Sequence, residues 1–206
     1  MTSWYRRRVV PHIIRLGCGC ALMDEYRQQV VPRARGCVLE IGLGAGANLR
    51  HYDRAKVTRV TGIEPSPELR AMAAHAQRVA RLPLEIVDAA GEALPFAAAS
   101  FDTVLCTFTL CTVDDVGRTL AEARRVLKPG GCFLFCEHGR APDAGVQKWQ
   151  ERIEPAWKRV FGGCHLTRPV RGNIERCFSI QDWTGGYQGR GLRIAGWLEW
   201  GAATAG

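Results

Sequence analysis

The sequence predicts an α/β protein with a doubly wound, mostly parallel seven-stranded sheet that ends in an antiparallel strand pair. Short apolar runs alternate with segments of helical spacing along most of the chain, which is typical of strands joined by crossover helices. One such run stops in three alternate glycines, and the strand after it ends in a carboxylate, Glu64. The last two apolar runs follow each other without a helix, which indicates the antiparallel pair.

The first 31 residues are predicted to be helical and to precede the sheet. Residues 4–23 mix arginine with valine, isoleucine and leucine, so this stretch can either cover an active site as a lid or lie on a bilayer. No apolar run approaches the roughly 18 residues of a membrane-spanning helix, and the arginines at 6–8 lack a signal-peptide core. We therefore expect a soluble, cytoplasmic protein with at most peripheral membrane contact.

The next part of the chain is predicted to form three strands with a helix after each of the first two. Residues 32–36 form a turn into the first strand, and the first crossover helix follows Gly46. Ser66 can cap the second helix through its hydroxyl, and Pro67 suits the first helical position. Apolar residues recur at helical spacing from Leu69 to Val79, so this helix packs on the sheet. The three strands cover 37–41, 57–63 and 84–87.

The second half is predicted to contain strands at 101–108, 132–136, 178–183 and 192–202 and helices at 113–127 and around 146–160. The last helix carries an apolar stripe at three- and four-residue spacing, and Pro155 should kink or restart it. Such a stripe is usually core. Here it follows the fifth strand, where ligands bind to sheets of this kind, so it can instead wall a substrate pocket. The stripe consists of Val146, Trp149, Ile153, Trp157 and Val160.

Composition indicates one domain over 1–206 and excludes several classes of protein. The length suits a single core, and no linker or internal repeat divides the chain. The net charge of +8 comes from dispersed arginines without an aromatic-flanked basic cluster, so we expect no nucleic-acid partner. The nine cysteines are odd in number and lack a C-x-x-C pair, which favours reduced, mostly buried thiols over disulfides or a metal site. No metal is predicted.

The glycine turn and Glu64 together indicate an adenosine-binding site. Gly42, Gly44 and Gly46 let the backbone turn sharply and approach a ligand, while Glu64 can accept hydrogen bonds from two ribose hydroxyls. The spacing lacks the G-x-G-x-x-G interval that brings a helix N-terminus onto a pyrophosphate. It therefore favours a ligand without phosphates, such as S-adenosylmethionine.

Five blocks in order resemble the class I S-adenosylmethionine-dependent methyltransferases, which have a Rossmann-like fold. The resemblance covers about residues 36 to 138, which it identifies as the cofactor-binding core. The blocks are 40–46, Glu64, Asp88-Ala89 with 92–96, 100–104 and 125–131.

The resemblance implies a cofactor site with S-adenosylhomocysteine as the product. By position, the three glycines face the methionine part, Glu64 the ribose, Asp88 the adenine amino group and Ala89 the ring. Without a ligand, Asp88 would be a helix cap and Glu64 a surface carboxylate. The remaining residues of the implied site are Glu40 and Pro65, together with Thr109 and Leu110 beside the sulfonium.

The C-terminal third resembles the branch that contains the methyltransferase-like 7 proteins and their bacterial relatives. The matching segments are 137–139, 149–150, 154–157 and 162–168, the last reading Gly-Gly-Cys-His-Leu-Thr-Arg. The branch implies S-methylation of hydrogen sulfide or small thiols, with residues 145–176 as a helical insertion on the substrate side. Its bacterial members are also labelled phospholipid or quinone methyltransferases, so these acceptors, or a non-catalytic cofactor-binding module, are the alternatives.

Methyl transfer requires alignment of the acceptor with the methyl group and an acceptor that has lost its proton. His138 and His165 are the candidates that would favour a thiolate, although each can equally be a structural histidine. Arg168 can pair with a carboxylate of the cofactor or acceptor, or form a surface ion pair. Cys164 and Cys111 lie near the expected pocket, where buried packing is the simpler role. The predicted substrate-side residues are Trp149, Trp157, Cys164 and Arg168.

Overall fold

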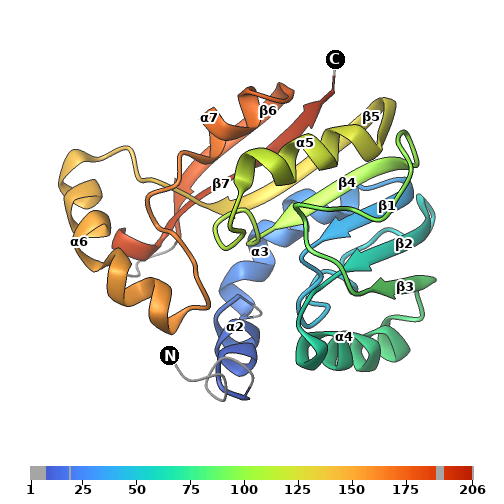
Figure 1. The fold of residues 1–206 in the computed structure, drawn as a ribbon, viewed down its shortest axis with the longest axis horizontal. Coiled ribbons are helices and arrows are strands. Elements are labelled where there is room, and N and C mark those ends of the chain that lie inside the picture. Colours follow the sequence, from blue (N-terminus) through green and yellow to red (C-terminus); the bar gives the residue numbers. More distant parts are fainter. Residues whose placement is uncertain (1–7, 19, 189–192, 206) are drawn as a thin grey trace.

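A seven-stranded sheet with strand order β3-β2-β1-β4-β5-β7-β6 forms the centre of the molecule (Figure 1). The computed structural model describes residues 8–18, 20–188 and 193–205. The neighbours from β3 to β5 pair in parallel, and β7 is antiparallel to both β5 and β6. This confirms the predicted fold class. The strands are β1 (Gly36–Ile41), β2 (Val57–Ile63), β3 (Leu84–Val87), β4 (Phe101–Thr107), β5 (Leu127–His138), β6 (Ser179–Tyr187) and β7 (Trp197–Thr204).

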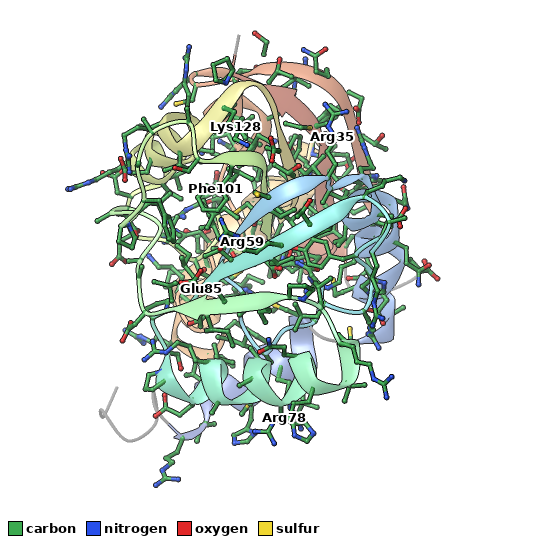
Figure 2. The ribbon with its side chains drawn as sticks, turned by 90° about the vertical axis from the view of Figure 1, so that its right-hand side faces the viewer. Arg35, Arg59, Arg78, Glu85, Phe101 and Lys128 are labelled. Carbon is green, nitrogen blue, oxygen red and sulfur yellow. The ribbon has the colours of Figure 1, made fainter. Side chains whose placement is uncertain are left out.

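Helices cover both faces of the sheet, and each face has its own apolar core. On one face, α3 (Ala21–Val30) and α4 (Pro67–Ala80) pack on the sheet through side chains such as Val30 and Ala73. Figure 2 shows α4 along β2 and β3, with Arg78 on the side that faces away from them. On the other face, α5 (Val116–Val126) and α7 (Val170–Glu175) pack through residues such as Leu120 and Ile174.

Two helices lie beyond the carboxyl ends of β1, β2 and β4, which lie at the same edge of the sheet (Figure 1). These are α2 (Val10–Cys18) and α6 (Ala144–Val160). Gly162, just after α6, lies against α2: a Cβ at this position would come within 3.0 Å of Val10 and 3.1 Å of Ile14. The helices α2 and α6, which are far apart in the sequence, therefore enclose the same edge of the sheet.

Short caps explain where several helices begin. Ser66 accepts a hydrogen bond from the Leu69 amide with Pro67 at the first helical position, as the sequence predicts. Asp115 accepts one from the Arg118 amide, so α5 begins at Val116 rather than at 113. β5 begins at Leu127 rather than at the predicted 132, and residues 128–131 form a bulge inside it, where the pairing with β4 shifts register.

The predicted helix after Gly46 is absent, and the described chain from 44 to 55 forms successive turns instead. Hydrogen bonds between residues three apart, such as Leu49 N to Gly46 O at 3.2 Å, replace the helical pattern. The glycines at 42, 44 and 46 have φ values of 74°, 56° and 80°, which a right-handed helix does not allow. Asn48 and Tyr52 then turn inward to the Glu40 carboxylate.

The apolar stripe of the 146–160 helix is not core. Trp149 is 52% exposed and Val160 42% exposed, and Gln150 is the buried residue of α6. The helix also continues through Pro155 without a restart.

The predicted N-terminal helical segment consists, in the described residues, of α2, α3 and a short 3-10 helix, η1 (Val31–Arg33). Residues 1–7, 19 and Leu192 lie outside the described residues. The predicted last strand is shorter at its start, because residues 193–195 form a 3-10 helix, η2 (Arg193–Ala195), and β7 begins at Trp197. In the part of the chain that is described, no helix is long and apolar enough to cross a membrane.

Candidate functional site

A cavity of about 1550 Å³ lies at the carboxyl ends of β1, β2 and β4. Its walls come from the glycine turn, the segment after β2, the loop after β4, α2 and the end of α6. Eleven of the predicted site residues line it: Glu40, Gly42, Gly44, Gly46, Glu64, Pro65, Ala89, Thr109, His138, Trp157 and Cys164. The cavity thus joins the predicted cofactor positions to part of the predicted substrate side.

The backbone of the glycine turn packs closely on the protein at Gly42 and leaves open space at Gly44. Backbone amides of Gly42 and Leu43 donate to the Ile63 carbonyl at 3.1 and 2.9 Å, which fixes the turn on β2. A Cβ on Gly42 would lie 2.1 Å from Thr109 Oγ1, so the loop after β4 packs directly on this backbone. Among the described residues, a Cβ on Gly44 would meet only the Gly42 carbonyl, at 4.0 Å. The space above Gly44 is therefore open to a ligand.

Glu64 lies at the end of β2 with its carboxylate held by backbone amides. Gly44 N donates to Oε2 at 3.0 Å, and Ser66 N donates to Oε1 at 2.9 Å. Burial raises the pKa of Glu64, and these two hydrogen bonds oppose the increase. Each oxygen keeps a further acceptor position, so the orientation suits a diol such as a ribose.

Asp88 is placed differently from its prediction. It is 68% exposed, forms an ion pair with Arg70 at 2.8 Å and does not line the cavity. Arg70 also donates to the Glu64 carbonyl at 2.7 Å, so it holds Asp88 on the outer side of this segment. The neighbouring Ala89 does line the cavity.

A buried polar network lies beneath the glycine turn, and most of it has no local sequence signal. Arg27, on α3, donates to Asn48 and to Thr107 Oγ1, the latter at 2.9 Å. Asn48 donates to Glu40 at 2.9 Å, and Tyr52 donates to the same carboxylate at 2.6 Å. Burial raises the pKa of Glu40 to about 7, against these hydrogen bonds and the charge of Arg27. Arg27 is not predictable as a site residue, because in the sequence it is one arginine on a polar helix.

The loop after β4 is held by a second buried carboxylate. Glu137, on β5, accepts from Thr109 N at 2.9 Å and from Cys111 N at 3.4 Å. Burial raises the pKa of Glu137 to about 7, and the loop amides oppose the increase. Phe108 has a left-handed φ of 53°, which is unfavourable for an aromatic residue and directs the chain toward the glycine turn. The sequence does carry a signal for Glu137, since it is a carboxylate within an apolar strand.

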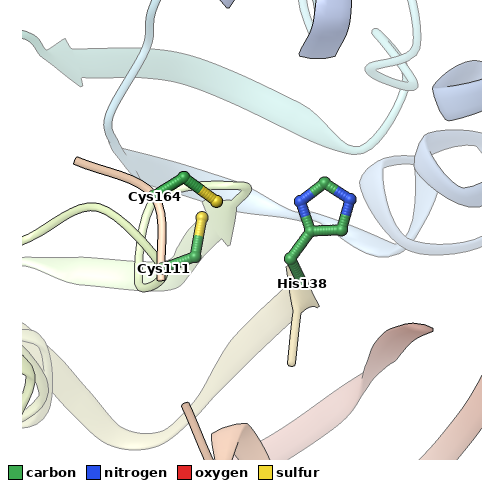
Figure 3. A group of neighbouring side chains, drawn as sticks. All are labelled: Cys111, His138 and Cys164. Atoms are coloured by element: carbon green, nitrogen blue, oxygen red, sulfur yellow. The ribbon is translucent and has the colours of Figure 1, made fainter. Parts of the chain in front are cut away.

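Cys111, His138 and Cys164 form a buried cluster on the cavity wall (Figure 3). Hydrogen bonding with Cys111 lowers the pKa of Cys164, whereas the same contact and burial raise the pKa of Cys111. Within the described part of the protein, the His138 Nε2 is buried and has no hydrogen-bond partner. All nine cysteines are free, and four of them are buried.

Four other predicted residues also lie outside the cavity lining. Trp149 is an exposed residue of α6 with Arg152 over its ring, and Leu110 is packed in the core. His165 lies 3.2 Å from Glu154 Oε1. Arg168 spans the loop after β4, donating to the Leu110 carbonyl and, at 2.6 Å, to the Val113 carbonyl. These contacts give His165 and Arg168 protein partners in place of a ligand.

Replacement of Arg168 by methionine is expected to lower the free energy of unfolding by about 1 to 3 kcal/mol, because two part-buried carbonyls lose a charged donor. Urea unfolding measures the change. Arg78→Met is the matched control: Arg78 is exposed on α4, and its loss should cost less than about 0.5 kcal/mol. Equal losses for the two variants would contradict a role of Arg168 in holding the loop.

The chain is similar to known methyltransferases. Residues 39–135 match the family model of the methyltransferase domain. The human thiol S-methyltransferase TMT1A is 40% identical over 159 residues, which cover 75% of this chain and 64% of that protein. The rat thiol S-methyltransferase TMT1B is 38% identical over 143 residues, 68% of this chain and 58% of that protein. The chain thus spans about three fifths of the length of these curated relatives.

Other relatives match a shorter part of the chain. A demethylmenaquinone methyltransferase of Tropheryma whipplei is 38% identical over 101 residues, 48% of this chain and 41% of that protein. Among solved structures, a geranyl diphosphate methyltransferase in complex with SAM has a TM-score of 0.69 at 15% identity, covering 100% of this chain and 92% of that one. The [4+2]-cyclase SpnF has a TM-score of 0.68 at 19% identity, covering 88% and 79%. These structural similarities support the fold alone.

Proposed function

Because the chain belongs to the methyltransferase domain family that its residues 39–135 match, we propose that it transfers a methyl group from S-adenosylmethionine to the sulfur of a small thiol. The extent of the similarity carries this proposal. The match to the human thiol S-methyltransferase covers 159 residues, whereas the match to the menaquinone enzyme covers 101. The longer match exceeds the methyltransferase domain itself, so it includes segments outside the common cofactor core.

The residues of the cavity fit the proposed cofactor. The open backbone at Gly44 leaves space for the methionine part, and Glu64 offers oriented acceptors to the ribose hydroxyls. Ala89 lines the cavity, where its backbone can meet the adenine ring. Asp88 is no longer included in this set, because it is exposed and paired with Arg70.

S-adenosylmethionine supplies an electrophilic methyl group on a sulfonium. The chain has to hold an acceptor sulfur in line with that methyl group and keep it deprotonated. Trp157, His138 and Cys164 line the part of the cavity beside the loop after β4 and are the candidates for this wall. A thiol is a stronger acid than a hydroxyl, with a pKa of about 8.5 for cysteine, so it needs less stabilisation of its anion than an alcohol acceptor would. We propose that α2 covers this space as a lid and that 145–176 is the substrate-side insertion.

A panel of acceptors tests the proposal. Purified protein and labelled S-adenosylmethionine would be combined with sulfide, methanethiol, a larger alkyl thiol, a phosphatidylethanolamine dispersion and a quinol. We expect turnover on thiols and a lower rate in the Glu64→Ala control at the same, subsaturating cofactor concentration, because that variant should bind the cofactor more weakly. Turnover only on the lipid or the quinol would replace the thiol by one of these acceptors. Cofactor binding without turnover on any acceptor would indicate a non-catalytic module.

A further inference from the structure

Two thiols and one imidazole meet at the cavity from three separate segments. Cys111 lies in the loop after β4, His138 is the last residue of β5, and Cys164 lies in the loop after α6. Their potential ligand atoms all lie within 4.8 Å of one another, and the three residues are buried. Figure 3 shows both sulfurs and one ring nitrogen of His138 pointing toward one another.

We propose that Cys111, His138 and Cys164 bind one zinc ion whose fourth coordination position receives the acceptor thiol. This inference rests on the proposed function and names how the site would hold its acceptor. Sulfur and imidazole ligands suit zinc, whereas calcium and magnesium require oxygen ligands. Zinc bound to sulfur and nitrogen at about 2.0 to 2.3 Å separates its ligand atoms by roughly 3.5 Å, so the cluster needs only a small contraction.

The charges of the three ligands also suit zinc. Two thiolates and a neutral imidazole balance the charge of a divalent ion, so the loaded site would be neutral, as its burial requires. The Arg27 guanidinium lines the same cavity and lies 4.8 Å from the centre of the Phe108 ring, which in turn lies against His138. A positive charge in the same cavity would help the site to accept one further anionic sulfur.

Backbone contacts position the two cysteines without any help from a metal. Cys111 N donates to the buried Glu137 carboxylate, and the Cys111 carbonyl accepts from His165 N at 2.8 Å. Cys164 N donates to the Phe161 carbonyl at 3.2 Å. Because His165 follows Cys164 directly, the hydrogen bond to Cys111 ties the two cysteine segments together. Ligands preorganised in this way favour metal binding.

The number of ligands favours a reactive site over a structural one. Structural zinc sites are closed by four protein ligands, whereas catalytic sites have three and one open position. In the described ranges, the group contains three residues, and all three line the cavity. The open position therefore faces the space that we assign to the acceptor.

Methyl transfer at this site would start from coordination of the acceptor sulfur. The acceptor thiol gives its proton to solvent when its sulfur binds zinc, because coordination favours the thiolate. A lone pair of that sulfur then forms the bond to the methyl carbon. The sulfonium carbon–sulfur bond breaks, and its electron pair stays on the donor sulfur. The product is a neutral thioether, which binds zinc less strongly than the thiolate and leaves.

Cobalt(II) titration of the full chain tests the metal site directly. After chelator treatment under a phosphine reductant, we expect one cobalt per chain, with thiolate charge-transfer and tetrahedral d–d absorption bands that zinc(II) removes. Cys111→Ser and Cys164→Ser should each weaken cobalt binding at least tenfold. Cys177→Ser is the matched control, because Cys177 packs against the core beneath α5 and α7, does not line the cavity and should leave the spectrum unchanged. Absence of these bands in the unmodified chain would overturn the inference.

A comparison of metal-free and zinc-loaded protein separates this inference from the proposed function. We expect S-adenosylmethionine to bind both forms equally and thiols to be methylated at least tenfold faster by the zinc-loaded form. Equal thiol turnover by both forms would overturn the zinc role and leave the proposed function standing. Cobalt binding with no thiol turnover by either form would overturn the proposed function, together with the assignment of the open position to a thiol.

Discussion

Glu64→Ala is expected to weaken binding of S-adenosylmethionine by about 1 to 3 kcal/mol, or roughly 5- to 150-fold. The carboxylate is buried at the end of β2, and the amides of Gly44 and Ser66 fix its orientation. Both ribose hydroxyls would lose an oriented acceptor, so the loss should be larger than that of one exposed hydrogen bond. Isothermal titration calorimetry measures the affinity.

Asp88→Ala is the matched control for this experiment. Both acids are implied by the same family resemblance, but Asp88 is exposed and paired with Arg70 outside the cavity. Its loss should change the affinity by less than about 0.5 kcal/mol. An unchanged affinity for Glu64→Ala would remove Glu64 from the site, and a large loss for Asp88→Ala would mean that Asp88 turns inward when the cofactor binds.

Gly42→Ala is expected to destabilise the fold by roughly 2 to 6 kcal/mol, since a left-handed φ and overpacking each cost about 1 to 3 kcal/mol. The new Cβ would lie 2.1 Å from Thr109 Oγ1 at a φ of 74°, so either the glycine turn or the loop after β4 must move. Chemical denaturation measures the loss of stability, and cofactor binding should fall with it.

Gly44→Ala separates the effect of a side chain in this turn on cofactor binding from its effect on stability. Its φ of 56° costs about 1 to 2 kcal/mol, but the Cβ would clash with none of the described residues. It would project into the space assigned to the cofactor, so we expect affinity to fall by at least tenfold while the variant stays folded. If affinity were unchanged, the cofactor would not contact the turn at Gly44.

The fold was predictable because its signals are local. Alternating apolar runs, the Ser66 cap and the adjacent final strands each specify one element within a few residues. The missing helix after Gly46 shows the limit of such signals. A crossover helix is expected after a glycine turn, but the left-handed glycines and the inward Asn48 and Tyr52 produce successive turns instead. The sequence leaves open whether the apolar stripe of α6 is core or a pocket wall. The structure exposes Trp149 and Val160 and places Trp157 on the cavity, because the helix lies beyond the sheet edge and has little sheet surface to cover (Figure 1).

The site was predictable where it depends on strand ends and not where it depends on distant partners. Gly42 and Glu64 follow neighbouring parallel strands, so the topology brings them together. The position of Asp88 depends on Arg70, and the buried positions of Arg27 and Glu137 depend on partners 20 or more residues away. The proximity of Cys111 and Cys164 likewise depends on a contact between the loop after β4 and the loop after α6. No spacing rule contains such information.

The contact between Gly162 and α2 constrains how this molecule can diverge. Val10 and Ile14 rest almost directly on the Gly162 backbone, and both segments line the cavity. A bulkier residue at 162 would displace α2 unless position 10 or 14 became smaller at the same time. Among descendants of this chain, the shape of the acceptor pocket should therefore change through paired replacements, one in α2 and one just after α6. Single replacements at these positions should be rare.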